Sequence, residues 1–295
     1  MGPWVHGSIG KLDFQASLND NGKPTDSLLT GGTQCSISTM AEESNSEYDL
    51  KPQGPDRGNA PNIRVGTSGF SYVEWRGIFY PEDLPQKKYL SYYAAHFNTT
   101  EINNTFYRIP TPKLAEGWRA EVPDSFLFTL KLSQKITHVK RLRNVEEEMS
   151  LFFSAAAELK EKLGPVLVQL PPNFKKNTEV FADFLARYAP GRMLAFEFRN
   201  ESWFDPEVYD LLRKHAAALG VVEPEESKQL PTVREVTGPF VYMRLRKGEY
   251  SDSELADWTS WMKAQTVNVF CYMKHDEQAP VLALRMLEAL GRSGS

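Results

Sequence analysis

Hydrophobic and polar positions follow a repeating order from Ile63 onward. Short runs rich in β-branched and aromatic residues, bounded by turn residues, are each followed by an amphipathic stretch with helical spacing. The predicted strands are 63–68, 98–103, 126–131, 165–170, 193–199, 219–223, 239–246 and 267–274. The predicted helices are 85–97, 112–120, 144–163, 177–189, 205–217, 251–265 and 279–290. This alternation is typical of βα units that build a parallel sheet.

The number of these units favours a closed barrel. A TIM-type (β/α)8 barrel has eight strands in about 250 residues, whereas an open doubly wound sheet usually has fewer strands. Local signals agree, because Asp205 followed by Pro206 is typical of a helix start and Ser251 begins a capping-box sequence. Gly164 and Gly220 are expected to end helices just before strands. The predicted fold class is therefore α/β, a closed (β/α)8 TIM-type barrel.

Residues 1–62 have a different composition. They are rich in Gly, Ser, Asn, Asp, Pro and Thr and show no sustained period, so they bury too little apolar surface to offset the entropy of ordering. We predict a disordered N-terminal tail over 1–62, one barrel domain over 63–290 and a flexible C-terminus over 291–295. The second methionine, Met40, leaves open whether the preceding residues belong to the natural protein.

Alternation along each strand predicts which side chains face the barrel interior. One parity of each strand packs on the surrounding helices and is apolar, whereas the other parity faces inward. Leu194, Phe196 and Phe198 form the apolar parity of the fifth strand, so Glu197 and Arg199 point inward. The same test gives further inward residues: Glu101, Asn103, Thr129, Lys131, Gln169, Tyr242, Arg244, Arg246, Tyr272 and Lys274.

Most of these polar residues come late in their strands, at the end where barrel enzymes build their active sites. A buried unpaired ion is costly, so the charged side chains must pair with one another or meet solvent and a ligand. Two interpretations stay open: a structural layer of ion pairs that closes the barrel top, and a ligand site. We favour the ligand site.

Composition narrows the classes of function. The chain has a net charge of −4 and a pI of about 5.8, which excludes a global basic field for nucleic-acid binding. Its two cysteines, Cys35 and Cys271, make a disulfide framework improbable. No apolar run approaches the roughly 18 to 20 residues of a membrane span, and no secretory signal peptide is present. We therefore expect a cytoplasmic protein without membrane contact.

Six segments of the barrel region carry a family pattern. They are VGTSGFSYVEWRGIFYP (65–81), TTEINNTFYRIP (99–110), ITHVKRL (136–142), LGPVLVQLPPNF (163–174), AFEFRNESWF (195–204) and YMRLR (242–246). Together they resemble the YecE-like family, domain of unknown function 72. The resemblance implies a closed barrel related in architecture to sugar isomerases and to a zinc-dependent DNA-repair endonuclease, and it implies no reaction. The chain departs from the family at 221–227 and 271–277, so those two walls are expected to bind something different or to bind it less well.

An anion site is the chemistry that we favour at the barrel mouth, because the planar guanidinium suits bidentate recognition of phosphate or carboxylate. Four cationic side chains would hold the anion: Lys131, Arg199, Arg244 and Arg246. Glu101 with Asn103 would orient sugar hydroxyls. Four aromatic residues would provide flat walls for stacking: Tyr72, Trp75, Tyr107 and Trp203. The other ligand-binding candidates are Ser68, His138, Gln169 and Tyr272.

Glu101 and Glu197 are alternatively the paired carboxylates of a glycosidase or lyase, with Lys131 as a third catalytic candidate. Cationic neighbours would lower the pKa values of the two carboxyl groups, which argues against a general acid but not against a base. We predict no cofactor and no metal, since only His138 and His275 of the five histidines come near the mouth. A single divalent ion on the two glutamates and His138 stays open.

A non-catalytic nucleic-acid-binding barrel is the rival hypothesis. A basic stretch follows the third strand: Lys135, His138, Lys140, Arg141 and Arg143. The acidic total and the acidic segment 223–226 weaken this hypothesis. Residues 66–69 lack the spacing of a Walker sequence, and Ser68 has no evident triad partners.

The sequence therefore predicts a barrel that binds a small anionic ligand, either phosphorylated and sugar-like or nucleotide-like. Isomerase, lyase and hydrolase activities all stay open, as does the oligomeric state.

Overall fold

The computed structural model of the chain describes residues 60–223, 230–274 and 277–291. Almost all of the predicted tail, the C-terminal residues 292–295, His275 and most of the acidic segment 223–226 lie outside the described residues. Eight parallel strands form one sheet in the order β1-β8-β7-β6-β5-β4-β3-β2. They are β1 (Ile63–Thr67), β2 (Thr99–Ile102), β3 (Leu127–Lys131), β4 (Leu163–Gln169), β5 (Leu194–Glu197), β6 (Ala218–Val222), β7 (Phe240–Leu245) and β8 (Asn268–Met273).

Side chains hold the seam between β1 and β2, the two strands at the ends of this order. The Thr67 amide donates to the Tyr93 hydroxyl at 2.8 Å, and that hydroxyl donates to the Thr99 carbonyl at 3.1 Å. Thr100 Oγ1 also donates to the Thr67 carbonyl at 3.2 Å. A Cβ atom on Gly66 would lie 2.1 Å from the Thr99 carbonyl oxygen, so only glycine allows this close approach. The predicted α/β barrel of TIM type is thus confirmed.

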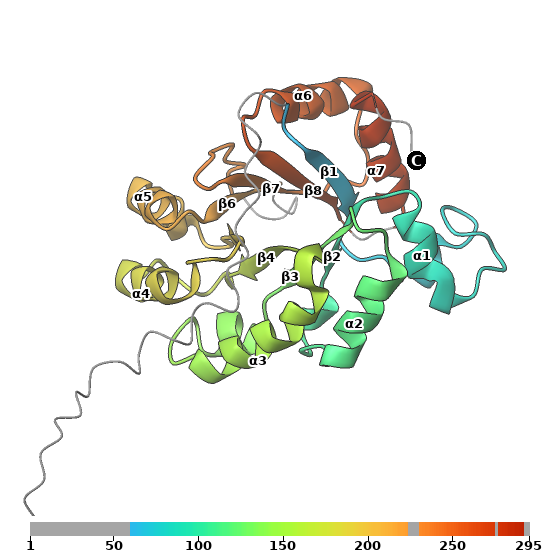
Figure 1. Cartoon of the computed structure of the whole chain (residues 1–295). Coiled ribbons are helices and arrows are strands. Elements are labelled where there is room, and N and C mark those ends of the chain that lie inside the picture. Colours follow the sequence, from blue (N-terminus) through green and yellow to red (C-terminus); the bar gives the residue numbers. More distant parts are fainter. Residues whose placement is uncertain (1–59, 224–229, 275–276, 292–295) are drawn as a thin grey trace, which may run out of the picture. The chain divides into compact units, whose positions relative to one another are not determined.

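Helices lie around the outside of the strands (Figure 1). They are α1 (Tyr89–Ala94), α2 (Pro112–Glu121), α3 (Glu146–Ala156), α4 (Thr178–Tyr188), α5 (Pro206–Lys214), α6 (Asp252–Lys263) and α7 (Ala279–Ala289). Short helical turns are Val73–Trp75, Gln86–Lys88, Asn104–Phe106, Lys135–Val139, Ala157–Lys162 and Glu201–Trp203. Asp205 caps α5 by accepting from the Glu207 amide at 2.9 Å, and the predicted capping box at Ser251 starts α6. Within the described residues, no helix combines the length and the apolar character needed to cross a bilayer.

The core has two layers, as the strand alternation predicts. Leu194, Phe196 and Phe198 are buried in the larger layer between strands and helices. A smaller cluster fills the barrel interior with the opposite parity: Leu167, Ala195, Ala218, Phe240, Tyr242, Phe270 and Tyr272. Polar residues of the inward parity continue from this interior cluster toward the carboxyl ends of the strands.

Two local predictions are wrong. The helix predicted over 144–163 is interrupted, because α3 ends at Ala156 and Lys160 has a positive φ of 51°. Gly164 and Gly220 do not end helices but lie inside β4 and β6. A Cβ atom on Gly220 would lie 3.0 Å from the carbonyl oxygen of Phe196, so this glycine permits close packing of neighbouring strands.

Candidate functional site

A buried guanidinium joins two buried carboxylates at the carboxyl ends of the strands. Glu101 on β2 and Glu197 on β5 are almost fully buried, and Arg244 on β7 lies between them. Arg244 Nη2 lies 2.9 Å from Glu101 Oε1, and Arg244 Nη1 lies 2.5 Å from Glu197 Oε2. One arginine therefore ties three strands that are not neighbours in the sheet, which the inward parity of all three residues makes possible.

Hydroxyl groups complete the coordination of Glu101. Ser68 Oγ donates to Glu101 Oε1, and the Tyr242 hydroxyl donates to Oε2. Asn103 Nδ2 in turn donates to Ser68 Oγ at 2.8 Å. Burial alone would raise the pKa of Glu101, but Arg244 and the two hydroxyl groups lower it below its ordinary value. Glu101 is therefore a carboxylate at neutral pH and not a general acid.

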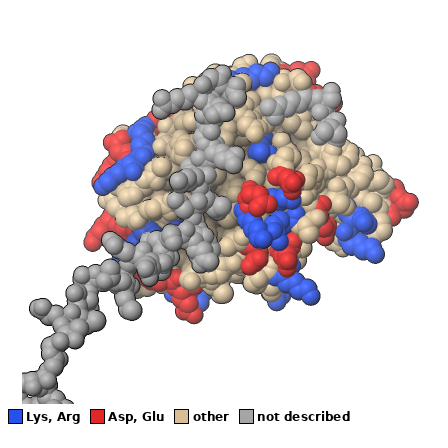
Figure 2. Space-filling view, in the orientation of Figure 1, with Lys and Arg blue, Asp and Glu red and all other residues tan. Residues whose placement is uncertain are grey.

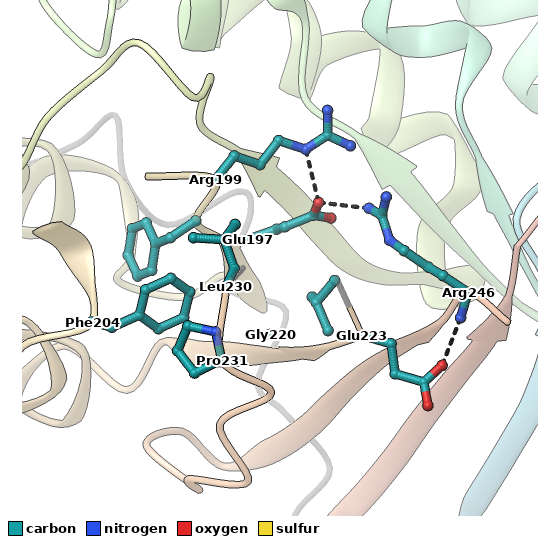
Figure 3. Close-up of a pocket in the computed structure, with 10 residues that line it drawn as sticks. Glu197, Arg199, Phe204, Gly220, Glu223, Leu230, Pro231 and Arg246 are labelled. Atoms are coloured by element: carbon teal, nitrogen blue, oxygen red, sulfur yellow. Dashed lines mark hydrogen bonds and ion pairs between the residues drawn. The ribbon is translucent and has the colours of Figure 1, made fainter. Parts of the chain in front are cut away.

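Glu197 accepts hydrogen bonds from three arginines. Besides the bond from Arg244, Glu197 Oε1 accepts from Arg246 Nη2 at 2.7 Å and from Arg199 Nε at 3.1 Å (Figure 3). Burial would raise the pKa of Glu197, but the three guanidinium groups lower it well below its ordinary value. The Arg246 backbone amide donates to Glu223 at 2.9 Å, which fixes the start of the loop after β7. The adjoining cavity in Figure 3 is only about 30 Å³, room for little more than a water molecule.

A larger cavity of about 350 Å³ opens above the arginines at the barrel mouth. Its lining includes nine of the predicted site residues: Ser68, Tyr72, Asn103, Tyr107, Lys131, Arg199, Arg244, Arg246 and Tyr272. Asn104, Leu245 and Lys274 also line it. Strand alternation already indicates that Lys274 faces inward, whereas Asn104 follows β2 in a helical turn where that alternation no longer applies.

His138 and Gln169 do not line this cavity. The His138 ring packs edge-on against Phe106 with a centroid separation of 4.8 Å, and Nδ1 lies 2.9 Å from Thr137 Oγ1. Burial, helped by Lys131 and Arg199, lowers the pKa of His138 to about 4, so the ring is neutral at pH 7. Gln169 is buried at the end of β4, and its Nε2 has no hydrogen-bond acceptor among the described residues.

Trp75 and Trp203 are misplaced by the sequence prediction, because both lie in the hydrophobic core and not on a wall of the cavity. Trp75 is 1% exposed and packs against Phe79 and Tyr80. Trp203 is fully buried, and its Nε1 donates to the Phe174 carbonyl at 2.6 Å. Both residues lie in short helical turns, where the alternation of a strand gives no direction.

The described residues hold no group of three or more His, Cys, Asp and Glu side chains placed to bind a metal ion. Glu101 and Glu197 are already bonded to arginine, so a cation would have to displace a guanidinium.

The basic stretch after β3 is partly neutralised. Lys135 and Lys140 each lie 2.7 Å from a carboxylate oxygen of Glu148, a largely buried residue of α3. Arg141 and Arg143 both lie 5.9 Å from the Phe174 ring centroid. On the face that Figure 2 shows, Lys and Arg side chains are interspersed with Asp and Glu side chains.

Two curated proteins are similar to this chain in sequence. The UPF0759 protein YunF of Bacillus subtilis is 31% identical over 189 residues, which cover 59% of this chain and 66% of YunF. The UPF0759 protein YecE of Escherichia coli K12 is 34% identical over 114 residues, which cover 38% of this chain and 39% of YecE. The chain thus spans less than two thirds of these relatives.

Two solved structures share the fold. The crystal structure of a DUF72 family protein from Thermotoga maritima superposes with a TM-score of 0.69 and 28% identity, covering 78% of this chain and all of that one. A DUF72 family protein from Enterococcus faecalis gives a TM-score of 0.65 and 23% identity, covering 79% and 97% of the two chains. The model of the family described as protein of unknown function DUF72 matches residues 64–295. This chain therefore belongs to the DUF72 family.

Proposed function

We propose that the barrel mouth binds a small anionic ligand, phosphorylated and sugar-like or nucleotide-like. The observation that carries the proposal is the gathering of cationic side chains around one cavity. Five cationic side chains line it: Lys131, Arg199, Arg244, Arg246 and Lys274. The carboxylates of Glu101 and Glu197 lie against three of them, Arg199, Arg244 and Arg246. An anion entering the cavity would accept charge-assisted hydrogen bonds from these cationic groups.

The rest of the lining suits a ligand with hydroxyl groups. Asn103 and Asn104 present amides at one wall, and Tyr72 and Tyr107 present aromatic rings. The Tyr107 side chain is 72% exposed, so it has surface available for stacking. A volume of about 350 Å³ falls in the usual range for small-molecule sites, roughly 300–1,000 Å³.

The chemistry of the site disfavours one class of reaction. A retaining or inverting glycosidase needs one protonated carboxylic acid, whereas Glu101 and Glu197 are both held in the charged form. Isomerase, lyase and hydrolase reactions that rely on a base or on a stabilised oxyanion remain compatible with the arginines.

Thermal denaturation with inorganic phosphate, sugar phosphates and nucleotides tests the proposal. A ligand at 100 times its Kd stabilises the protein by about 2.7 kcal/mol, which raises Tm by about 5–10 °C. Arg199→Ala is expected to abolish the rise, whereas Arg187→Ala, at an exposed arginine of α4, should keep it. A rise that survives Arg199→Ala, or no rise across the panel, contradicts the proposal.

A further inference from the structure

Lys131 occupies an unusual environment for a lysine. It ends β3, points into the mouth cavity and is only 9% exposed. Its Nζ lies 4.2 Å from the centroid of the Phe106 ring, so one side of the ammonium group faces an aromatic surface. Among the described residues, no carboxylate oxygen lies within 4.0 Å of Nζ and no oxygen accepts a hydrogen bond from it.

Another buried lysine shows what a structural role looks like. Lys162 is 5% exposed, and its Nζ donates to the carbonyl groups of Arg119 and Val122 at 3.0 and 2.7 Å. It also lies 3.2 Å from an Asp124 carboxylate oxygen. Lys162 therefore has oxygen partners that stabilise its charge, whereas Lys131 faces a ring and a cavity.

Burial and the nearby guanidinium groups favour the neutral amine of Lys131, against the opposing effect of Glu101 and Glu197. Glu101 and Glu197 are its nearby carboxylates, but Arg244 binds both of them. Burial, and then the positive charge of Arg244, lower the pKa of Lys131 to about 8. About a tenth of the lysine is then the free amine at pH 7, compared with less than about a thousandth for a solvated lysine with a pKa near 10.4.

We propose that Lys131 forms an imine with an anionic aldehyde or ketone bound in the barrel mouth. The proposal rests on the anion site described above, since the arginines would hold the phosphate or carboxylate of such a compound. They would thereby bring its carbonyl carbon to the amine. A buried lysine amine next to cationic groups is a recognised way to obtain this nucleophile.

The step balances without an oxidant or reductant. The lone pair of Lys131 Nζ adds to the carbonyl carbon, and the electron pair of the C=O bond moves to oxygen. Oxygen gains the proton that nitrogen loses, which gives a carbinolamine. A proton from solvent then allows the hydroxyl group to leave as water, and the protonated imine remains.

Pyridoxal 5′-phosphate is a suitable probe, because it carries an aldehyde and a phosphate. The whole chain is treated with the probe, reduced with borohydride, digested and mapped by mass spectrometry. We expect the reduced adduct on Lys131, at least tenfold more than on Lys162 or on the exposed Lys113. Inorganic phosphate should suppress the adduct on wild-type Lys131, and pyridoxal without phosphate should label it at least tenfold less.

Variants separate the two proposals. Lys131→Arg should lose the adduct, while Lys113→Arg should keep both the adduct and the rise of Tm with sugar phosphates. If phosphate compounds raise Tm and the adduct never forms on Lys131, imine formation is overturned and the anion site stands. If neither effect occurs, both proposals fall.

Discussion

Arg244 Nη1 lies 2.5 Å from Glu197 Oε2, in a bond that crosses the barrel interior from β7 to β5. The same guanidinium binds Glu101 on β2, so one side chain links three strands of the barrel. One guanidinium thus bonds to two buried carboxylates, and Arg199 and Arg246 bring further positive charge to Glu197.

Removing the central guanidinium should destabilise the barrel strongly. Arg244→Ala leaves Glu101 and Glu197 buried with fewer partners, and breaking a buried pair in this way costs about 3–5 kcal/mol. Urea denaturation at pH 7 measures the loss. Arg285→Ala is the control, since it removes an exposed pair with Asp252 and should change stability by less than about 1 kcal/mol. Equal losses in the two variants would contradict a structural role for the link.

The buried carboxylates should also make stability depend on pH. The pKa values of Glu101 and Glu197 are lowered from 4.5 in the folded protein, so folding favours their charged forms. Their contribution is complete above about pH 5.5 and is lost as pH falls through 4.5 toward the lower folded values. Glu197→Gln is expected to be less stable at pH 7 and to show a flatter decline between pH 5 and 3. The exposed Glu288→Gln should keep the wild-type slope.

Strand alternation predicts the direction of a side chain but not its partner. It correctly turns Glu101, Glu197 and Arg244 inward, because residues two apart on a strand share a face. That Arg244 binds both carboxylates depends on the register of β2, β5 and β7 and on side-chain length, which no single strand encodes. Trp203 shows a second limit of predicting side-chain direction from alternation. It lies in a helical turn after β5, where the period of two residues no longer applies.

The seam between β1 and β2 should be intolerant of a single added carbon. A Cβ atom at Gly66 would lie 2.1 Å from the Thr99 carbonyl oxygen, and that atom is backbone. We expect Gly66→Ala to lower the free energy of unfolding by at least about 3 kcal/mol. Gly248→Ala is the matched control, since a Cβ atom there has nothing within 4 Å. Unchanged stability of Gly66→Ala in urea denaturation would mean that the two strands lie further apart.

The Tyr272 hydroxyl should stabilise the barrel from inside. It lies 2.8 Å from Thr99 Oγ1 and 2.7 Å from Thr129 Oγ1, between β2, β3 and β8. Tyr272→Phe leaves buried hydroxyl groups with one partner fewer, at a cost of about 1–3 kcal/mol. Tyr107→Phe, at a side chain that is 72% exposed, should change stability by less than about 0.5 kcal/mol. Thermal denaturation of the two variants gives the comparison.

Single-stranded RNA should bind weakly, if at all. Two of the basic residues after β3, Lys135 and Lys140, already pair with Glu148. We expect a Kd in the non-specific range, no tighter than about 10⁻⁶ M at physiological salt. Tight binding would instead support the nucleic-acid hypothesis, provided that Lys140→Ala makes the affinity less sensitive to salt. The expected change in salt sensitivity is that of about one lost phosphate contact.

Lys131 should be the most reactive lysine near neutral pH, even toward a probe without charge. Reductive methylation with formaldehyde needs the neutral amine, and burial with Arg244 lowers the pKa of Lys131 to about 8. Its reactivity should therefore rise between pH 7 and 9 and then level off. A solvated lysine, with an ordinary pKa of about 10.4, keeps gaining reactivity above pH 9. The ratio of Lys131 methylation to total surface-lysine methylation, measured by mass spectrometry, should fall as pH rises from 7 to 10. A ratio that is constant or rises with pH would contradict a lowered pKa of Lys131. The surroundings of the amine would then stabilise its ammonium form as well as water does.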